Sequence, residues 1–375
     1  MLCIYNKDLC VMEFNSKDGC KILDYSMLPY PLMHTDVSYD DVYSWLQTRV
    51  MDIGRTNAKS LCRVLRLPQS NKMVIGELMH YATLSDCFWV KDSEEKTTWD
   101  DVSLFKNTFE EIIARVALTG ENAKAFLYKN NIRTPEITTL GVAPKAWIRD
   151  EVGSIHLIKE TRLESPASLI LDALGVEHVP YSNIDSVRVR QLLNSKADLS
   201  GAFFAECPLI SSEDRYMLYW EDYEVYCAAN NMDAYDIIKQ NEAMTIRFHT
   251  MNVADYILGN DDRHKGNFGL FVDQPSNTLQ GFYPLLDHDH AFVAGPLRAQ
   301  TFDYDVDITL EKAAMMGLEY LSGKGVLPDI EKVTSTTKPE RLTDSEWAGV
   351  LSRCNSCLSF LEKTTAASKE ETLNK

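Results

Sequence analysis

The sequence predicts an α+β protein with a strand-rich lobe, a mainly helical lobe after it, and an extra region at the N-terminus. Residues 136–211 are mainly strand-like and contain one helical segment, whereas the apolar spacing from Tyr216 onward is mostly helical. A polar segment between Gly120 and Pro135 separates the strands from the part that precedes them. We therefore expect three regions, residues 1–120, 121–211 and 212–375.

The N-terminal region combines short strands with helices. Three strand-like segments, at 2–5, 10–14 and 20–23, are compatible with a small antiparallel meander. Helical patterns follow at 39–47, 58–65 and 72–82. With 375 residues and 45% apolar content, the chain is long enough to bury a sizeable core spread over several packed units.

The charge of the chain restricts its partners. A net charge of −17 repels phosphate-rich surfaces, so we expect no direct binding to nucleic acid or to an anionic membrane. A protein partner, in particular a basic one, fits this charge better. No run approaches the roughly 18 to 20 apolar residues of a membrane span, and the first residues lack a signal-peptide pattern. We therefore expect a cytoplasmic location.

Cysteine usage indicates neither a disulfide framework nor a zinc site. The nine cysteines are an odd and scattered set. Cys354 and Cys357 form the one Cys-x-x-Cys motif, and no second pair completes a zinc ligand set. We expect these two residues to be ordinary core or surface thiols.

The most informative feature is a polar run from Gly259 to Asn267, followed by an acidic cluster at 286–290. Phosphoryl transfer needs a carboxylate beside the attacking hydroxyl, together with an amide oxygen and a second carboxylate that hold Mg2+ against the nucleotide phosphates. Asp262, Asn267 and Asp287 can supply these groups. Asp262 and Asn267 are five residues apart, which is the spacing of the equivalent pair in protein-kinase catalytic loops.

The residues after the run predict a hairpin that completes this site. Residues 268–272 have the pattern of a strand, 273–277 that of a turn, and 279–286 that of the returning strand. The hairpin would bring Asp287 back beside Asn267.

The order Asp-x-His-x-x-Asn at 262–267 resembles that of the HipA-like kinases and, more distantly, that of the phosphoinositide kinases. Three further segments are similar to the phosphate loop, the nucleotide-lysine strand and the following helix and strand of the HipA-like family: 138–146, 155–159 and 164–181. Two segments, 84–91 and 98–109, resemble sequence that precedes the kinase core in a Gram-positive branch of that family.

This resemblance implies a bilobal protein-kinase-like fold and an ATP- and Mg2+-dependent kinase that phosphorylates Ser or Thr of a protein substrate. It implies that Asp262 is the base or hydroxyl-orienting group and that Asn267 and Asp287 bind the metal. It further implies a toxin of a toxin–antitoxin pair, whose usual partner is a DNA-binding antitoxin.

Lys159 and Glu164 have positions that suit a nucleotide-binding pair. Ile155, Leu157 and Lys159 fall on one face of a predicted strand, so the ammonium would point into a cleft, toward phosphate oxygens. Glu164 opens the next predicted helix, which ends at Gly175. A carboxylate there could pair with Lys159, as the Lys–Glu pair of kinases does.

The loop from Leu140 to Lys145 is expected to cover the nucleotide phosphates. Backbone N–H groups beside Gly141, aided by Lys145, could cradle phosphate oxygens. Thr138 and Thr139 lie close enough in sequence to be tested as sites of self-phosphorylation.

His264 is expected to pack under the catalytic loop and to bond to its backbone, supporting the turn rather than binding Mg2+, which prefers oxygen ligands. The loop also departs from the family pattern. Gly266 stands immediately before Asn267, where HipA-like loops commonly carry Lys, and Lys265 is one position earlier.

Two other functions fit some of the same residues. The cluster Asp287-His288-Asp289-His290, with Asp262 and His264, could form the transition-metal site of a phosphohydrolase. A kinase-like fold without turnover would be a nucleotide-binding regulator, although the joint presence of all the catalytic groups argues against it. Among acceptors, a lipid is disfavoured by the acidic charge and by the absence of an amphipathic basic helix.

Overall fold

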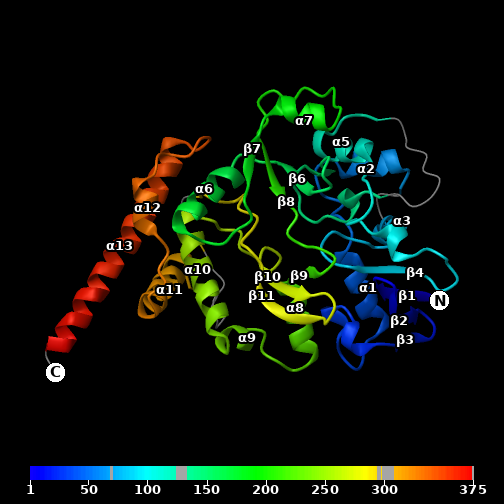
Figure 1. Ribbon diagram of the computed structural model, residues 1–375, viewed down its shortest axis with the longest axis horizontal. Coiled ribbons are helices and arrows are strands. Elements are labelled where there is room, and N and C mark those ends of the chain that lie inside the picture. Colours follow the sequence, from blue (N-terminus) through cyan, green and yellow to red (C-terminus); the bar gives the residue numbers. More distant parts are fainter. Residues whose placement is uncertain (68–70, 124–132, 294–296, 298–307, 374–375) are drawn as a thin grey trace.

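The computed structural model describes residues 1–67, 71–123, 133–293, 297 and 308–373, with side chains described up to residue 366. Within these residues the chain forms three antiparallel sheets, and helices pack around them (Figure 1). A strand-rich lobe is followed by a mainly helical one, so the predicted α+β class is confirmed.

The first sheet belongs to the N-terminal region. Its strand order is β3-β2-β1-β4, with β1 at Leu2–Asn6, β2 at Leu9–Asn15, β3 at Gly19–Ile22 and β4 at Phe88–Asp92. The predicted meander of the first three strands is confirmed, and β4 pairs with the free edge of β1. The helices here are η1 (Tyr25–Met27), η2 (Tyr30–Leu32), α1 (Tyr39–Thr48), α2 (Ala58–Leu65), α3 (Lys72–Leu78), α4 (Trp99–Val102) and α5 (Glu111–Thr119).

Helix α3 stops before its predicted end at Ala82. His80 and Tyr81 adopt positive φ angles of 50° and 56°, which turn the chain sharply. The turn folds the Tyr81 ring against Gly76, where a Cβ would lie 2.1 Å from Cε1 of the ring. The His80 carbonyl also accepts a hydrogen bond from the Val90 N–H at 2.8 Å. These tertiary contacts outweigh the local helical pattern.

The second sheet forms the strand-rich lobe. Its order is β5-β6-β8-β7, with β5 at Lys145–Arg149, β6 at Ile155–Glu160, β7 at Ser182–Ile184 and β8 at Phe204–Pro208. The predicted helix is α6 (Glu164–Leu174), and it ends at Gly175 with φ +68°. The short helices η3 (Pro135–Ile137) and α7 (Ser186–Leu192) were not predicted. Helix α5 covers one face of the sheet, where Ala114 and Leu118 join the apolar cluster of Ala146, Ile158 and Phe204.

The third sheet, ordered β11-β10-β9, lies among the helices of the C-terminal lobe. The strands are β9 (Arg215–Tyr219), β10 (Gly269–Asp273) and β11 (Thr278–Phe282), and the helices are α8 (Trp220–Ala229), α9 (Asp236–Lys239), α10 (Glu242–Leu258), α11 (Leu310–Lys324), α12 (Ile330–Ser335) and α13 (Asp344–Leu373). The predicted hairpin is therefore present. Its returning strand ends at Phe282, and the chain then crosses to an isolated bridge between Leu285 and His178.

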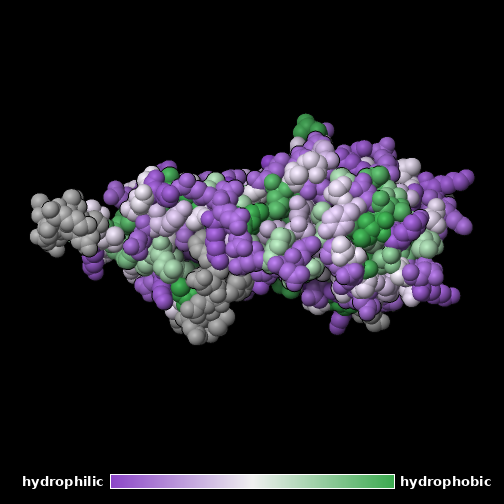
Figure 2. All heavy atoms as spheres, turned by 90° about the horizontal axis from the view of Figure 1, so that it is seen from below, coloured by the Kyte–Doolittle hydropathy of each residue, from purple (hydrophilic) through white to green (hydrophobic). Residues whose placement is uncertain are grey.

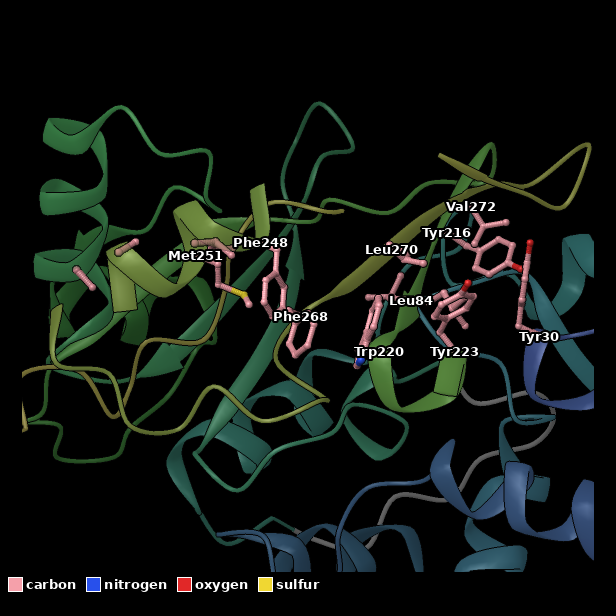
Figure 3. Packing of buried hydrophobic residues seen from close by; sticks show 14 of the residues in the cluster. Tyr30, Leu84, Tyr216, Trp220, Tyr223, Phe248, Met251, Phe268, Leu270 and Val272 are labelled. Atoms are coloured by element: carbon pink, nitrogen blue, oxygen red, sulfur yellow. The ribbon is translucent and has the colours of Figure 1, made fainter. Parts of the chain in front are cut away.

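One continuous apolar core joins this hairpin to its neighbours. The Trp220 and Phe268 rings stack with centroids 5.4 Å apart, and Phe248 and Met251 of α10 lie beyond Phe268 (Figure 3). On the other side the core reaches Tyr30 of the N-terminal region, whose hydroxyl donates to the Asn277 carbonyl at 3.1 Å. The N-terminal region is thus packed directly on the hairpin that carries the candidate site.

The surface is mostly hydrophilic on the face seen in Figure 2, with hydrophobic side chains in small separate patches. Such scattered exposure is ordinary for a folded protein. None of the helices in the described ranges is long and apolar enough to cross a membrane. All nine cysteines are free thiols, and Cys354 and Cys357 are buried in α13, in line with the expectation of ordinary thiols.

Candidate active site

The candidate catalytic loop begins where α10 ends. Gly259 caps the helix with φ +65°, a left-handed conformation that glycine adopts without strain. The Asn260 amide then donates to Asp255 Oδ1 at 2.8 Å, which ties the start of the loop back to the helix. From this anchored point the chain runs through Asp262 to Asn267 and enters β10.

Arg263 lies buried beneath this loop and holds it together. Its guanidinium bonds both carboxylate oxygens of Asp255, at 2.9 and 3.0 Å. It also donates to the carbonyls of Asn267 and Leu286, both at 2.6 Å, and contacts His288 Nε2 at 3.0 Å. One side chain therefore joins the helix, the loop and the end of the hairpin. No role was predicted for Arg263, and its place in the polar run 259–267 was the only signal in the sequence.

Backbone hydrogen bonds shape the loop above Arg263. The Asp262 carbonyl accepts from the His264 N–H at 2.8 Å and from the Asn267 side-chain amide at 2.9 Å. The Asn267 amide nitrogen is thereby fixed on the loop, while the Asp262 side chain stays partly exposed.

His264 does not pack under the loop, so that part of the prediction is wrong, whereas the predicted hydrogen bond to the loop backbone is present. The side chain is exposed, and its Nδ1 accepts a hydrogen bond from the Gly266 N–H at 3.0 Å. The loop turns so tightly that a Cβ on Gly266 would lie 2.9 Å from His264 Cε1. The long side chain of Arg263 occupies the space beneath the loop, because its guanidinium can donate hydrogen bonds to two backbone carbonyls and to Asp255 at once.

The hairpin returns Asp287 to a buried ion-pair cluster around Lys159. The Lys159 ammonium lies 2.9 Å from Glu164 Oε1 and 2.7 Å from Asp287 Oδ1, and it also pairs with Asp289. The predicted pair between Lys159 and Glu164 is therefore present. The second Glu164 oxygen accepts from the His288 N–H at 3.0 Å, so Glu164 joins α6 to the hairpin.

Charge pairing sets the protonation of this cluster. Burial alone would lower the pKa of Lys159, but the carboxylates of Glu164, Asp287 and Asp289 raise it well above its ordinary value. Burial likewise opposes ionisation of Asp287, yet the charge and hydrogen bond of Lys159 hold its pKa below the ordinary value. For Asp289 the burial effect prevails and raises the pKa. Lys159 and Asp287 are thus ionised near neutral pH.

Asp289 adds a carboxylate that could bind a metal and that the kinase interpretation of the sequence had not included. Oxygens of Glu164, Asp287 and Asp289 lie within 4.8 Å of one another. Carboxylate oxygens are the ligands that Mg2+ prefers, so the donor set suits that ion. Asp287 adopts φ 59°, an unusual conformation for a residue with a side chain, which is often retained at functional positions.

The histidines do not join this cluster. His288 is buried and engaged by Arg263 and by Glu164, whose Oε2 lies 3.7 Å from Nδ1. Neither Asp262 nor His264 belongs to the described group of potential ligands. The mixed His and carboxylate site of a phosphohydrolase is therefore not assembled among the described residues.

The loop before β5 folds over a second buried lysine. Lys145 and Lys159 are paired across β5 and β6, so their side chains share one face of the sheet. The Lys145 ammonium donates to the Leu140 carbonyl at 2.8 Å. Gly141 has φ +90°, and a Cβ there would lie 2.4 Å from Lys145 Nζ. Burial, with Lys159 and Arg55 nearby, lowers the pKa of Lys145 to about 7.

Arg55 of the N-terminal region joins η3, which precedes this loop, to Lys145 at the loop's end. Its guanidinium donates to the Glu136 carbonyl at 2.8 Å and to the Lys145 carbonyl at 2.9 Å. The two candidate self-phosphorylation residues are also engaged. Thr138 is buried, and the Thr139 hydroxyl donates to the Pro135 carbonyl at 2.6 Å while accepting from the Trp147 indole at 2.9 Å.

A cavity of about 290 Å³ brings these groups together. Lys145, Lys159, Asn267 and Asp287 all line it, as do Gly141 and His264. The N-terminal region forms another part of the wall through Tyr30, Trp45, Arg49 and Leu84. This contribution was not predicted, because nothing in residues 1–120 carries a nucleotide-binding motif.

The strand-rich lobe followed by the mainly helical lobe forms a kinase-like fold. HipA of Shewanella oneidensis MR-1, solved with HipB and operator DNA, is similar over 97% of this chain and 99% of that chain, with a TM-score of 0.54 and 13% sequence identity. The fold expected from the HipA-like resemblance is thereby confirmed, whereas membership of a Gram-positive branch stays a prediction.

Two other kinases match at lower scores. The proinflammatory kinase CtkA of Helicobacter pylori covers 57% of this chain and 90% of its own, with a TM-score of 0.41 and 14% identity. The Golgi casein kinase covers 59% of this chain and 70% of its own, with a TM-score of 0.33 and 14% identity. No protein-family model and no curated protein matches the sequence.

Proposed function

We propose that this protein is an ATP- and Mg2+-dependent kinase of HipA-like type that phosphorylates Ser or Thr of a protein. The observation that supports it most is the convergence on one cavity of Lys159, held between Glu164 and Asp287, and the loop that carries Asp262 and Asn267. Phosphoryl transfer depends on positioning and charge stabilisation, which are the two properties this arrangement provides.

Each group has a distinct proposed role. Lys159 and Lys145 donate to the phosphate oxygens of ATP, and the loop at Gly141 covers them. Asp262, partly exposed on the loop that contributes Asn267 to the cavity wall, orients the acceptor hydroxyl and takes its proton. The acceptor oxygen then forms a bond to the γ-phosphorus while the bond to the leaving ADP oxygen breaks.

Asn267 and Asp287 are the proposed Mg2+ ligands, with Asp289 available as a further carboxylate. When bound, the ion would neutralise negative charge on the phosphates. The oxygen-only donor set fits this ion better than a transition metal that favours histidine.

The proposed setting is the cytoplasm, with a protein substrate. The structural neighbour HipA was solved with HipB and operator DNA, which supports proposing an antitoxin partner and a toxin role here. Contact with DNA would then come through that partner, since the net charge of −17 opposes direct binding by this chain.

The deciding experiment is intact mass after incubation with ATP and Mg2+, alone and with a cytoplasmic extract as acceptor. Transfer to the protein or to an acceptor is expected for the wild type and is lost in Asp262→Asn. Asp261→Asn, on the exposed neighbouring residue, is the matched control and should transfer normally. Equal transfer by Asp262→Asn would remove Asp262 from its role, and no transfer by the wild type would contradict the kinase proposal.

A nucleotide-binding regulator is the second candidate, and one observation favours it. The loop has Gly266 before Asn267, and the neighbouring Lys265 is paired with Glu224 at 2.6 Å, so that this lysine is engaged away from a transferred phosphate. A regulator would still be stabilised by ATP in a thermal melt, without any phosphate gain in the mass experiment.

A further inference from the structure

The C-terminal segment reaches back to the strand-rich lobe at the connection between β6 and α6. Arg162 lies in this connection, between Lys159 and Glu164 in the sequence. Its guanidinium donates to both carboxylate oxygens of Glu346 on α13, at 2.9 and 2.5 Å, and to the Arg341 carbonyl at 2.6 Å. Paired, planar contacts of this kind restrict orientation as well as distance.

The two residues that accept these hydrogen bonds, Glu346 and Arg341, are held in place by further contacts. Glu346 accepts a hydrogen bond from the Thr343 N–H at 2.8 Å and from its hydroxyl at 2.9 Å, at the start of α13. Arg341 donates to the Phe204 carbonyl at 3.0 Å, at the first residue of β8. The hydrogen bond from Arg162 lowers the pKa of Glu346 to about 2, so the carboxylate is ionised at every physiological pH.

The same segment also holds the far end of α6. The Asp329 N–H, just before α12, donates to the Leu174 carbonyl at 3.0 Å. On its inner side, the connection is tied to the hairpin, because the Thr161 hydroxyl donates to Asp289 Oδ1 at 2.5 Å. Helix α6, which carries Glu164, is therefore bracketed at both ends by residues from the C-terminal part of the chain.

We propose that Arg162 and Glu346 are positioning residues, through which the C-terminal segment sets the distance between Lys159 and Glu164. This inference rests on the proposed role of that pair in holding ATP. Neither Arg162 nor Glu346 lines the cavity, so they act through the connection and not by touching the nucleotide. Loss of the contact should let α6 move relative to β6 and loosen the ion pair.

The test is the rate at which an amine-acylating reagent labels Lys159 in the full chain, measured by peptide mass spectrometry. In the wild type the Lys159 side chain is 4% exposed and its ammonium is ion-paired, so labelling should be slow. Glu346→Gln should raise the labelling rate of Lys159 at least about twofold, because residues in contact are usually coupled by at least that factor. The half-exposed Lys106 is the internal reference and should label equally in all proteins.

Asp344→Asn is the matched control. Asp344 also lies at the start of α13, but its partner is the exposed Lys338, so it does not reach the strand-rich lobe. Should Glu346→Gln fail to fold, Arg162→Lys keeps the charge, loses the paired geometry and allows the same comparison. Unchanged labelling of Lys159, or an equal rise in Asp344→Asn, would overturn the proposal.

Two outcomes separate this inference from the proposed function. If the wild type transfers no phosphate, the kinase proposal fails, but the labelling rates still decide whether Glu346 positions Lys159. If it does transfer phosphate, Glu346→Gln should raise the KM for ATP more than it changes kcat. A general loss of stability would instead lower the melting temperatures of Glu346→Gln and Asp344→Asn and leave the ratio of the two kinetic effects unchanged.

Discussion

Lys159 Nζ lies 2.7 Å from Asp287 Oδ1, although 128 residues separate them in the sequence. This contact joins the strand-rich lobe to the hairpin of the helical lobe. Because Lys159 is also bonded to Glu164, a single cation from β6 is shared by carboxylates from α6 and from the segment that follows the hairpin. The geometry of the candidate site therefore depends on how the two lobes pack.

Removing this cation should expose the repulsion between the remaining carboxylates. We expect Lys159→Met to lower the free energy of unfolding by about 3 to 5 kcal/mol, the usual cost of breaking a buried ion pair on one side. Mg2+ should restore more stability to this variant than it gives the wild type, because the oxygens of Glu164, Asp287 and Asp289 lie within 4.8 Å of one another. Thermal melts with and without Mg2+ measure both effects. Identical Mg2+ responses in the two proteins would contradict this account.

Arg263→Lys should disrupt the candidate catalytic loop while keeping the positive charge. A lysine cannot bond both oxygens of Asp255 and the carbonyls of Asn267 and Leu286 at the same time. We expect a loss of roughly 2 to 4 kcal/mol in urea unfolding, together with loss of phosphate transfer. Arg188→Lys, on an exposed face of α7, is the control and should leave both unchanged. A variant at Arg263 as stable as this control would show that the hydrogen-bond network is dispensable.

Nucleotide binding should take up a proton above neutral pH. The pKa of Lys145 is lowered to about 7 by burial and by the nearby Lys159 and Arg55. At pH 8 its amine is mostly neutral, and phosphate oxygens would favour the protonated form. Calorimetric titration with ATP in buffers of different ionisation enthalpy measures the uptake, which should vanish in Lys145→Met. A wild-type titration without proton uptake would place Lys145 outside the phosphate site.

The lowered pKa of Lys145 also makes the free energy of unfolding depend on pH. Because the folded state holds the pKa of Lys145 below its usual value, the unfolded chain binds more protons between about pH 7 and 10.5. The contribution of Lys145 to stability should therefore rise with pH across that window. The difference in unfolding free energy between the wild type and Lys145→Met, followed against pH, isolates this contribution from other titrating groups.

Gly141→Ala and Gly153→Ala form a matched pair. Both glycines have positive φ, of 90° and 92°, so each substitution strains the backbone by about 1 to 2 kcal/mol. An added Cβ meets Lys145 Nζ at 2.4 Å in the first case and nothing within 4 Å in the second. We expect only Gly141→Ala to weaken ATP binding, measured by titration, because it displaces the buried ammonium. Equal ATP affinities of the two variants would mean that the loop does not contact the nucleotide.

Local patterns predicted much of the fold. The helices α2 and α6, the first meander and the hairpin were all evident from apolar spacing and from turn residues such as Gly175. These elements depend on neighbours within a few residues, so the sequence contains the information directly. The early end of α3 at Leu78 was missed because a contact between Tyr81 and Gly76 and the pairing with β4 decide it.

The sequence by itself determined which polar groups could serve a kinase-like site, since the five-residue spacing of Asp262 and Asn267 and the order of Lys159 and Glu164 are local properties. Only the tertiary structure decided that Arg263, and not His264, lies beneath the loop, that Asp289 joins Asp287, and that the N-terminal region lines the cavity. The physical reason is that burial and ion pairing depend on residues far apart in the chain. A polar run has the same composition whichever of its side chains the packing encloses.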